Sequence, residues 1–210
     1  MIYLYKMEHK EIENPIGGRQ MLALYCSDIR HADERKARQL PRSPQKGSAF
    51  GVSLLEYAVL RQWNLPLPAL TPPGHGKPAF ADMPGKYFSI SHTNTHVMVA
   101  LSEAPVGVDI QTRREITEQS ARALMDDTEW EQFDFHDLWC LRESLYKLNG
   151  AGNLRDVLRF RRTENGIVFP VPGVTGFLIS GIEGCAAAVC QEQSFLLPGV
   201  NWVDAAELCK

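Results

Sequence analysis

Apolar residues recur along the chain in runs that are short enough to be strands. Four such runs, each bounded by turn residues, predict strands in the first part of the chain: Met21–Cys26, Tyr87–Ser91, His96–Leu101 and Val106–Ile110. Three more follow toward the C-terminal end, with glycines between them: Gly166–Val171, Gly176–Ser180 and Cys185–Cys190. The predicted strands therefore fall into two groups, separated by a stretch of different periodicity.

Helical spacing of apolar residues predicts the remaining elements. One core helix is expected over Gly47–Trp63, and another over Asp137–Leu148, where four leucines form a stripe that ends before Asn149-Gly150. Between them, Thr117 can cap a helix that runs to Met125. The Thr128-x-x-Glu131 spacing predicts a capping box at the start of a second, short helix.

The order of these elements indicates an α+β protein. Strand, helix and strands are followed by helices and strands, which favours two α+β halves of comparable size over one doubly wound sheet. We expect an N-terminal half over residues 1–108 and a C-terminal half over residues 109–210.

Composition narrows the class of protein further. The chain has 210 residues, long enough for a sizeable core, and 22 Lys+Arg against 25 Asp+Glu give a net charge of −3. That balance argues against a dedicated nucleic-acid binder. No apolar run suits a signal peptide or a membrane span. Five scattered cysteines lack any CxxC pair, so we expect reduced, mostly buried thiols in a cytoplasmic protein without a membrane partner.

Two candidate functional residues lie on the second predicted core helix. Glu143 and Lys147 are four residues apart, which taken alone favours an ordinary surface ion pair. Asp109 favours a metal site over a surface ion pair, because it is a lone carboxylate in an apolar strand and can act together with Glu143. Two carboxylates suffice for Mg²⁺ when substrate phosphates and water complete its coordination.

Other residues are suited to binding phosphate. Gly74-His75-Gly76-Lys77-Pro78 presents a lysine on a glycine-rich turn, although it lacks the spacing of a P-loop and a plain turn is the simpler interpretation. Ser91-His92 lies where a strand meets a turn, with a capping or packing role as the alternative. The basic segment 28–42 is either a solvated helix face, which we favour, or an anion-binding rim.

Four blocks in order resemble the 4′-phosphopantetheinyl transferases. They are Gly76-Lys77-Pro78, Phe88–Thr93, Pro105–Ile110 and the run from Trp139 to Lys147. The likeness is to the monomeric, surfactin-synthetase-activating type and covers about a third of the chain. It implies two similar α+β halves packed as a pseudo-dimer, with the active site in the cleft between them. The implied reaction transfers the phosphopantetheine arm of coenzyme A to a serine of an apo acyl or peptidyl carrier protein and releases 3′,5′-bisphosphoadenosine.

The resemblance also implies roles for individual residues. Asp109 and Glu143 match the acids that bind Mg²⁺, and Gln111 stands where the family has a third acid, so we expect a looser metal or a preference for Mn²⁺. Glu143 would take the proton of the carrier serine, and Lys147 would meet the leaving phosphate. Arg142 stands where many members have lysine. Six residues match or fall near coenzyme A contacts: Lys77, Ser91, His92, Arg35, Lys46 and Ser48.

Partners and rival functions follow from the same residues. Carrier proteins are acidic, so the basic and apolar residues after the metal strand are candidates for docking: Arg113, Arg114, Arg122 and Met125. A chain that holds both halves is expected to be a monomer. A metal-dependent phosphoesterase acting on coenzyme A would use the same acids and lysines. A binding module that has lost turnover is the third possibility, favoured only by Gln111.

Overall fold

The structure, a computed structural model, describes residues 21–32, 46–71, 77–149 and 159–209. Its larger sheet has the strand order β2-β3-β1-β9. The members of this sheet are β1 (Leu22–Asp28), β2 (Tyr87–His92), β3 (His96–Ser102) and β9 (Val200–Trp202). β3 pairs antiparallel with β1 and β2, whereas β9 pairs parallel with β1. Strand β9, which forms the outer edge of this sheet beside β1, thus comes from a part of the sequence far from the other three strands.

A second sheet has the order β4-β8-β7, with antiparallel pairing throughout. It consists of β4 (Val106–Thr112), β7 (Val174–Ile179) and β8 (Cys185–Glu192). A separate hairpin pairs β5 (Arg161–Thr163) with β6 (Gly166–Val168).

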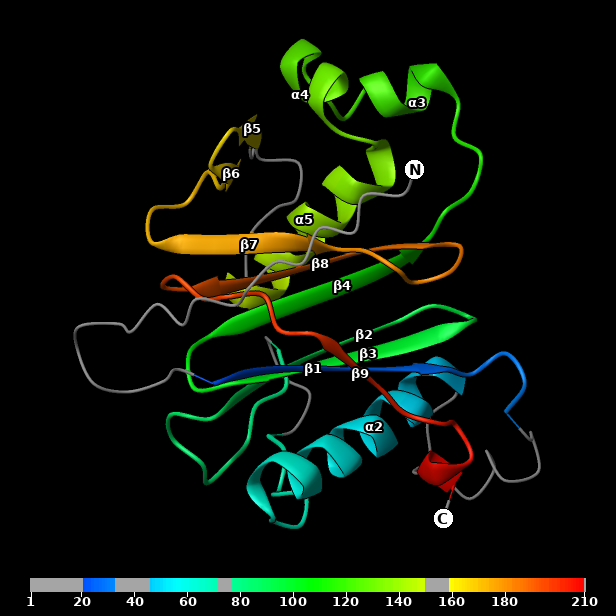
Figure 1. Cartoon of the computed structure of the whole chain (residues 1–210), viewed down its shortest axis with the longest axis vertical. Coiled ribbons are helices and arrows are strands. Elements are labelled where there is room, and N and C mark those ends of the chain that lie inside the picture. The colour runs from blue at the N-terminus through cyan, green and yellow to red at the C-terminus, as the bar shows by residue number, and fades with distance from the viewer. Residues whose placement is uncertain (1–20, 33–45, 72–76, 150–158, 210) are drawn as a thin grey trace, which may run out of the picture.

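The two sheets pack face to face, and each carries a helix on its outer face (Figure 1). Strand β3 is covered on both faces in this arrangement, and every residue in it is buried. Its odd-numbered residues Val97 and Val99 pack in the core beneath α2 (Lys46–Trp63), whereas Met98 packs in the core between the sheets. Since neighbouring side chains in a strand point to opposite faces, an apolar run without alternation places β3 in an inner layer.

Strand β8 is buried in the same way on the other side. Its even-numbered residues Ala186 and Ala188 pack beneath α5 (Phe135–Asn149), and Val189 faces the other sheet. Helix α5 approaches the adjacent strand closely at Gly107, where a Cβ atom would overlap the carbonyl oxygen of Ser144. This close packing brings the C-terminal part of α5 against the start of β4.

The short helices correct two predictions. Thr117 caps α3 (Glu118–Arg122) as expected, but that helix ends before Met125. The capping box of α4 (Asp127–Gln132) is formed by Asp126 and Glu129, so the prediction for Thr128 and Glu131 was wrong. Asp126 accepts the Glu129 backbone N–H at 2.7 Å, and Glu129 accepts the Asp126 N–H at 3.1 Å. The N-cap of α4 therefore lies two residues before the predicted cap, Thr128.

Other boundaries also differ from the predictions. The strand expected over Gly166–Val171 ends at Val168, and the predictions did not include β5, β9 or the 3₁₀ turn η1 (Glu207–Cys209). The mixed α+β class and the free state of all five cysteines are confirmed. The division at residues 108 and 109 stays a prediction, and it falls within β4. Over the described ranges, every helix is too short or too polar to cross a membrane.

Candidate functional site

Asp109 lies on β4, where β2 of the other sheet comes close to it, and Glu143 lies on α5, which packs against β4. These strands belong to different sheets, and side-chain hydroxyls on β2 reach across to backbone groups on β4. Ser89 Oγ accepts the Val108 N–H at 3.1 Å, and Ser91 Oγ accepts the Ile110 N–H at 3.2 Å. Both serines are buried, so they satisfy backbone donors that would otherwise lack a partner. Ser89 was not among the predicted site residues, although its spacing of two from Ser91 was a usable signal.

Asp109 is the centre of the site and is 1 % exposed. Its Oδ1 accepts from Lys147 Nζ at 2.6 Å and from Ser91 Oγ at 2.7 Å, and its Oδ2 accepts from Gln111 Nε2 at 3.0 Å. Lys147 also donates to Ser91 Oγ at 2.8 Å. Because a buried carboxylate requires charge pairing and hydrogen bonds, these contacts offset the cost of burying the Asp109 side chain in the core.

Glu143 lies one turn before Lys147 on α5 and is half-buried. Burial raises the pKa of its carboxyl, the negative charge of Asp109 raises it further, and the Lys147 ammonium opposes both. A carboxylate whose pKa is raised toward neutrality is better suited to accept a proton in catalysis. The three residues that the sequence grouped therefore influence one another electrostatically.

The donor set fits a hard divalent cation. Asp109 and Glu143 offer carboxylate oxygens, and Gln111 adds an amide beside Asp109. No group of three or more His, Cys, Asp or Glu within the described ranges forms a metal cluster. Two carboxylates completed by substrate phosphates are nevertheless a usual arrangement for Mg²⁺. The role of these three residues as ligands stays a prediction.

A cavity of about 360 Å³ opens beside this centre. Its lining joins two lysines with mainly apolar side chains: Lys77, Pro78, Phe88, Ser89, Ile90, Tyr146 and Lys147. Lys77 donates a hydrogen bond to the Val106 carbonyl oxygen. Burial lowers the pKa of Lys77 to about 8, an effect that Cys190 opposes and the Lys147 charge reinforces. Two cations on an apolar wall suit a ligand that carries phosphate and less polar groups.

His92 lies at the end of β2 and contacts the first turn of α2. Its Nε2 lies 3.1 Å from Ser48 Oγ, and a Cβ atom on Gly47 would overlap the imidazole ring. Burial lowers the pKa of His92, the Lys147 charge lowers it further, and Asp109 raises it. His92 and Ser48 thus meet on the side of the site near Lys147 and Asp109.

Two of the predicted coenzyme A contacts cannot be placed at the level of side chains. Arg35 lies outside the described residues, and Lys46 is described only as the first residue of α2. Most of the basic segment 28–42 and the glycines before Lys77 also lie outside the described ranges.

Arg142 faces a second buried carboxylate that the sequence analysis missed. Its Nη2 lies 2.9 Å from Glu129 Oε2, and its Nη1 donates to the Leu124 carbonyl at 2.5 Å. Glu129 is fully buried and also accepts the Phe160 N–H at 3.0 Å. This pair attaches α4 and the chain before β5 to the helix that carries Glu143.

Two of the four candidate docking residues line a second cavity of about 350 Å³. Arg114 and Met125 line it together with Trp130 and Phe133, whereas Arg113 forms ion pairs with acids at the start of α5. Arg122 pairs with Glu118 at 2.7 Å and lies over the Trp130 ring. Arg114 and Met125 therefore line the cavity, whereas Arg113 and Arg122 are each paired with an acid that lines it, Asp134 and Glu118.

Comparison with known proteins supports the resemblance to the surfactin-activating phosphopantetheinyl transferases. The 4′-phosphopantetheinyl transferase Sfp of Bacillus subtilis (strain 168) is 34% identical over 37% of this chain and 39% of its own length. The 4′-phosphopantetheinyl transferase psf-1 of Bacillus pumilus is 29% identical over 49% of each chain. The transferase gsp of Aneurinibacillus migulanus is 35% identical over 37% of this chain and 36% of its own. No protein-family model matches, and the chain covers less than half the length of these relatives.

Proposed function

We propose that this chain, which resembles 4′-phosphopantetheinyl transferases over part of its length, transfers the phosphopantetheine arm of coenzyme A to a serine of an apo carrier protein. The observation that carries the proposal is the meeting of Asp109, Glu143 and Lys147 beside the cavity that Lys77 also lines. Coenzyme A has a pyrophosphate, which suits the lysines and a metal held by the acids, and a long arm, which suits the apolar wall.

The reaction exchanges one phosphorus–oxygen bond for another. The serine oxygen of the carrier attacks the phosphorus that bears the pantetheine arm, and the bond to 3′,5′-bisphosphoadenosine breaks. Glu143 takes the serine proton, a role that its raised pKa supports. Lys147 neutralises the charge that develops on the leaving phosphate. In phosphoryl transfer of this kind, positioning and charge neutralisation supply most of the catalysis.

Asp109 and Glu143 would hold Mg²⁺, or Mn²⁺, with Gln111 at the edge of the site. The metal, when bound, neutralises the pyrophosphate of coenzyme A. Gln111 lacks the charge of a third acid and donates to Asp109 Oδ2, so we propose that it orients this carboxylate. For Ser91 we propose this orienting role in place of the predicted contact with coenzyme A, because its hydroxyl group already bonds to Asp109, Lys147 and the Ile110 N–H.

The nucleotide end of coenzyme A would lie toward Lys77, His92 and Ser48, with Lys46 and Arg35 as further contacts. The link between His92 and Ser48 at the start of α2 supports this side, since the first turn of a helix has free backbone N–H groups that favour anions. The two sheets, each with its own helix, support the proposed pseudo-dimer of two halves with the site between them.

For the carrier protein we propose the hollow lined by Arg114, Met125, Trp130 and Phe133. Its apolar floor can receive an apolar side chain of the carrier helix, and Arg114 can meet an acidic neighbour. One chain supplies both sheets and all five cysteines are free, which supports a monomer in the reducing cytoplasm.

The release of 3′,5′-bisphosphoadenosine, measured with and without an apo carrier protein in Mg²⁺, tests this function. We expect release only with the carrier, in a one-to-one ratio with the modified protein. Release without the carrier would identify the chain as a phosphoesterase. Binding of coenzyme A without release in either case would identify a binding module.

A further inference from the structure

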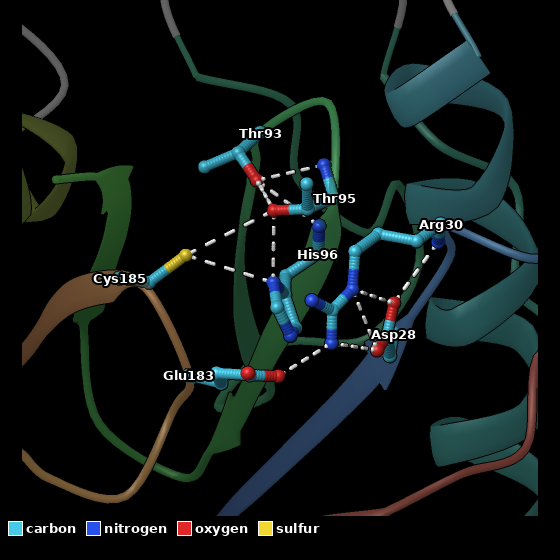
Figure 2. A network of polar contacts seen from close by, with 7 residues as sticks. All are labelled: Asp28, Arg30, Thr93, Thr95, His96, Glu183 and Cys185. Atoms are coloured by element: carbon cyan, nitrogen blue, oxygen red, sulfur yellow. Dashed lines mark hydrogen bonds and ion pairs between the residues drawn. The ribbon is translucent and has the colours of Figure 1, made fainter. Parts of the chain in front are cut away.

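Polar side chains outside the proposed site connect the two sheets at the edge where β2 turns into β3 (Figure 2). We call Thr93, Thr95, His96 and Cys185 the edge cluster. The first three belong to the turn after β2 and the start of β3, and Cys185 begins β8 of the other sheet. The proposed function uses none of these four residues.

Thr93 shapes the turn itself. Its backbone N–H donates to the His96 carbonyl at 2.8 Å. Its Oγ1 accepts the backbone N–H groups of Thr95 at 3.1 Å and of His96 at 3.0 Å. A hydroxyl that caps a turn in this way fixes the backbone locally. The residue immediately before this turn is His92.

Cys185 contacts the turn from the other sheet. Its Sγ lies 3.6 Å from His96 Nδ1 and 4.0 Å from Thr95 Oγ1, and these two atoms lie 3.0 Å from each other. Burial raises the pKa of the Cys185 thiol and lowers that of His96. A protonated thiol and a neutral imidazole can therefore form a hydrogen bond inside the protein.

A second link runs beside the first but is exposed. Arg30 Nη2 lies 2.7 Å from Asp28 at the end of β1 and 2.8 Å from Glu183, next to the start of β8. Exposed ion pairs of this kind contribute little, because water and salt screen them. His96 and Cys185 are buried at 2 % and 8 % exposure, so water and salt screen the edge cluster less than this ion pair.

The distance between the sheets matters because the proposed site is divided between them. Ser91 and His92 belong to one sheet and Asp109 to the other, and no backbone ladder joins β2 to β4 in the described sheets. Their relative placement depends on the apolar core packed between the sheets and on side-chain links, among them Ser89 and Ser91 within the site and the edge cluster at its end.

We infer that Cys185 and His96 are positioning residues that hold the β2–β3 turn against the second sheet and thereby place His92 for the nucleotide end of coenzyme A. The inference rests on the proposed function. It assigns the two residues no contact with coenzyme A. Their effect reaches the site through the backbone of Thr93 and His92.

The kinetic test compares Cys185→Ala with Cys185→Ser in the full chain. We expect Cys185→Ala to raise the KM for coenzyme A about three- to tenfold, as the loss of one buried hydrogen bond would, with kcat and the KM for the carrier protein near wild type. Serine keeps a donor at this position and should restore the KM. Cys209→Ala, which removes a thiol on η1, is the matched control and should have no effect. An unchanged KM in Cys185→Ala would overturn the inference.

Amide hydrogen exchange tests the turn without relying on catalysis. Exchange at Thr93, Thr95 and His96 should be faster in Cys185→Ala and normal in Cys185→Ser and Cys209→Ala. His96→Asn, whose amide group can replace Nδ1, should behave as Cys185→Ser does. If the wild-type chain transfers nothing, the proposed function fails while this measurement still reports on the turn. Unchanged exchange in Cys185→Ala would overturn the positioning role in either case.

Discussion

Lys147 Nζ lies 2.6 Å from Asp109 Oδ1, so the positive charge near the end of α5 is paired with a carboxylate in the core of the neighbouring sheet. Lys147 is one quarter exposed, whereas Asp109 has almost no contact with solvent. The pair both stabilises the packing of α5 on β4 and holds the two groups that the proposed reaction needs in one place.

Removing the lysine should therefore affect stability as well as activity. In Lys147→Ala, Asp109 keeps Ser91 and Gln111 but loses its cation, and we expect the free energy of unfolding to fall by about 2 kcal/mol in metal-free urea titrations. The double variant Asp109→Asn/Lys147→Ala should lose less than the sum of the two single changes. Strict additivity would mean that the ion pair contributes nothing to folding.

Lys77 should impose a pH dependence on the use of coenzyme A. Its pKa is lowered to about 8, so the free protein loses this positive charge as the pH rises through 8. Because the ligand is anionic, kcat/KM for coenzyme A should fall above about pH 8. The Lys77→Arg variant keeps its positive charge, so its kcat/KM for coenzyme A should not fall in this way above pH 8. A wild-type profile that stays flat to pH 9.5 would contradict the proposed contact.

Gln111→Glu should strengthen the response to metal. The change replaces the amide that donates to Asp109 Oδ2 with a second negative charge, so the metal-free protein should melt about 2–6 °C lower. Added Mg²⁺ should raise its Tm by more than it raises that of wild type. Gln119→Glu, on the exposed surface of α3, is the control and should respond as wild type does. Equal metal shifts in all three proteins would contradict a metal at Asp109.

Gly107→Ala tests the close approach of α5 to β4. The added Cβ would overlap the backbone of Ser144 and Leu148, which cannot move without displacing the helix. We expect a loss of about 3 kcal/mol in unfolding free energy and a large loss of transfer activity. Nothing surrounds Gly199 within 4 Å, so Gly199→Ala is the control and should be close to neutral. Equal stability of the two variants would show that the contact is not tight.

Much of the fold could be predicted because burial leaves a direct pattern in the sequence. The leucines at 138, 141, 145 and 148 predicted the buried face of α5, and the unbroken apolar run of β3 predicted a strand. Strand β9 left no such pattern. It has three residues, two of them exposed, and it exists because β1 offers a free edge far away in the sequence.

The same holds for the candidate site: spacing within one element is visible in the sequence, whereas contacts between distant elements are not. The sequence and its family resemblance grouped Asp109, Glu143 and Lys147, and the structure brings Lys147 onto Asp109. The i,i+4 spacing alone favoured a surface ion pair between Glu143 and Lys147. Spacing within a helix does not tell which strand the helix packs against, so the contact of Lys147 with Asp109 could not be predicted from it. Glu129 was missed for the same reason, since its buried partner Arg142 lies thirteen residues away.

The most direct test of the account is the intact mass of an apo acyl or peptidyl carrier protein after incubation with this chain, coenzyme A and Mg²⁺. The account predicts a gain of one phosphopantetheine group on the carrier serine. The gain should disappear when the metal is chelated, and its rate should fall about 10²-fold or more with Glu143→Gln, which removes the proposed base. An unmodified carrier under these conditions, across acyl and peptidyl carriers and with Mn²⁺ as well, would contradict it.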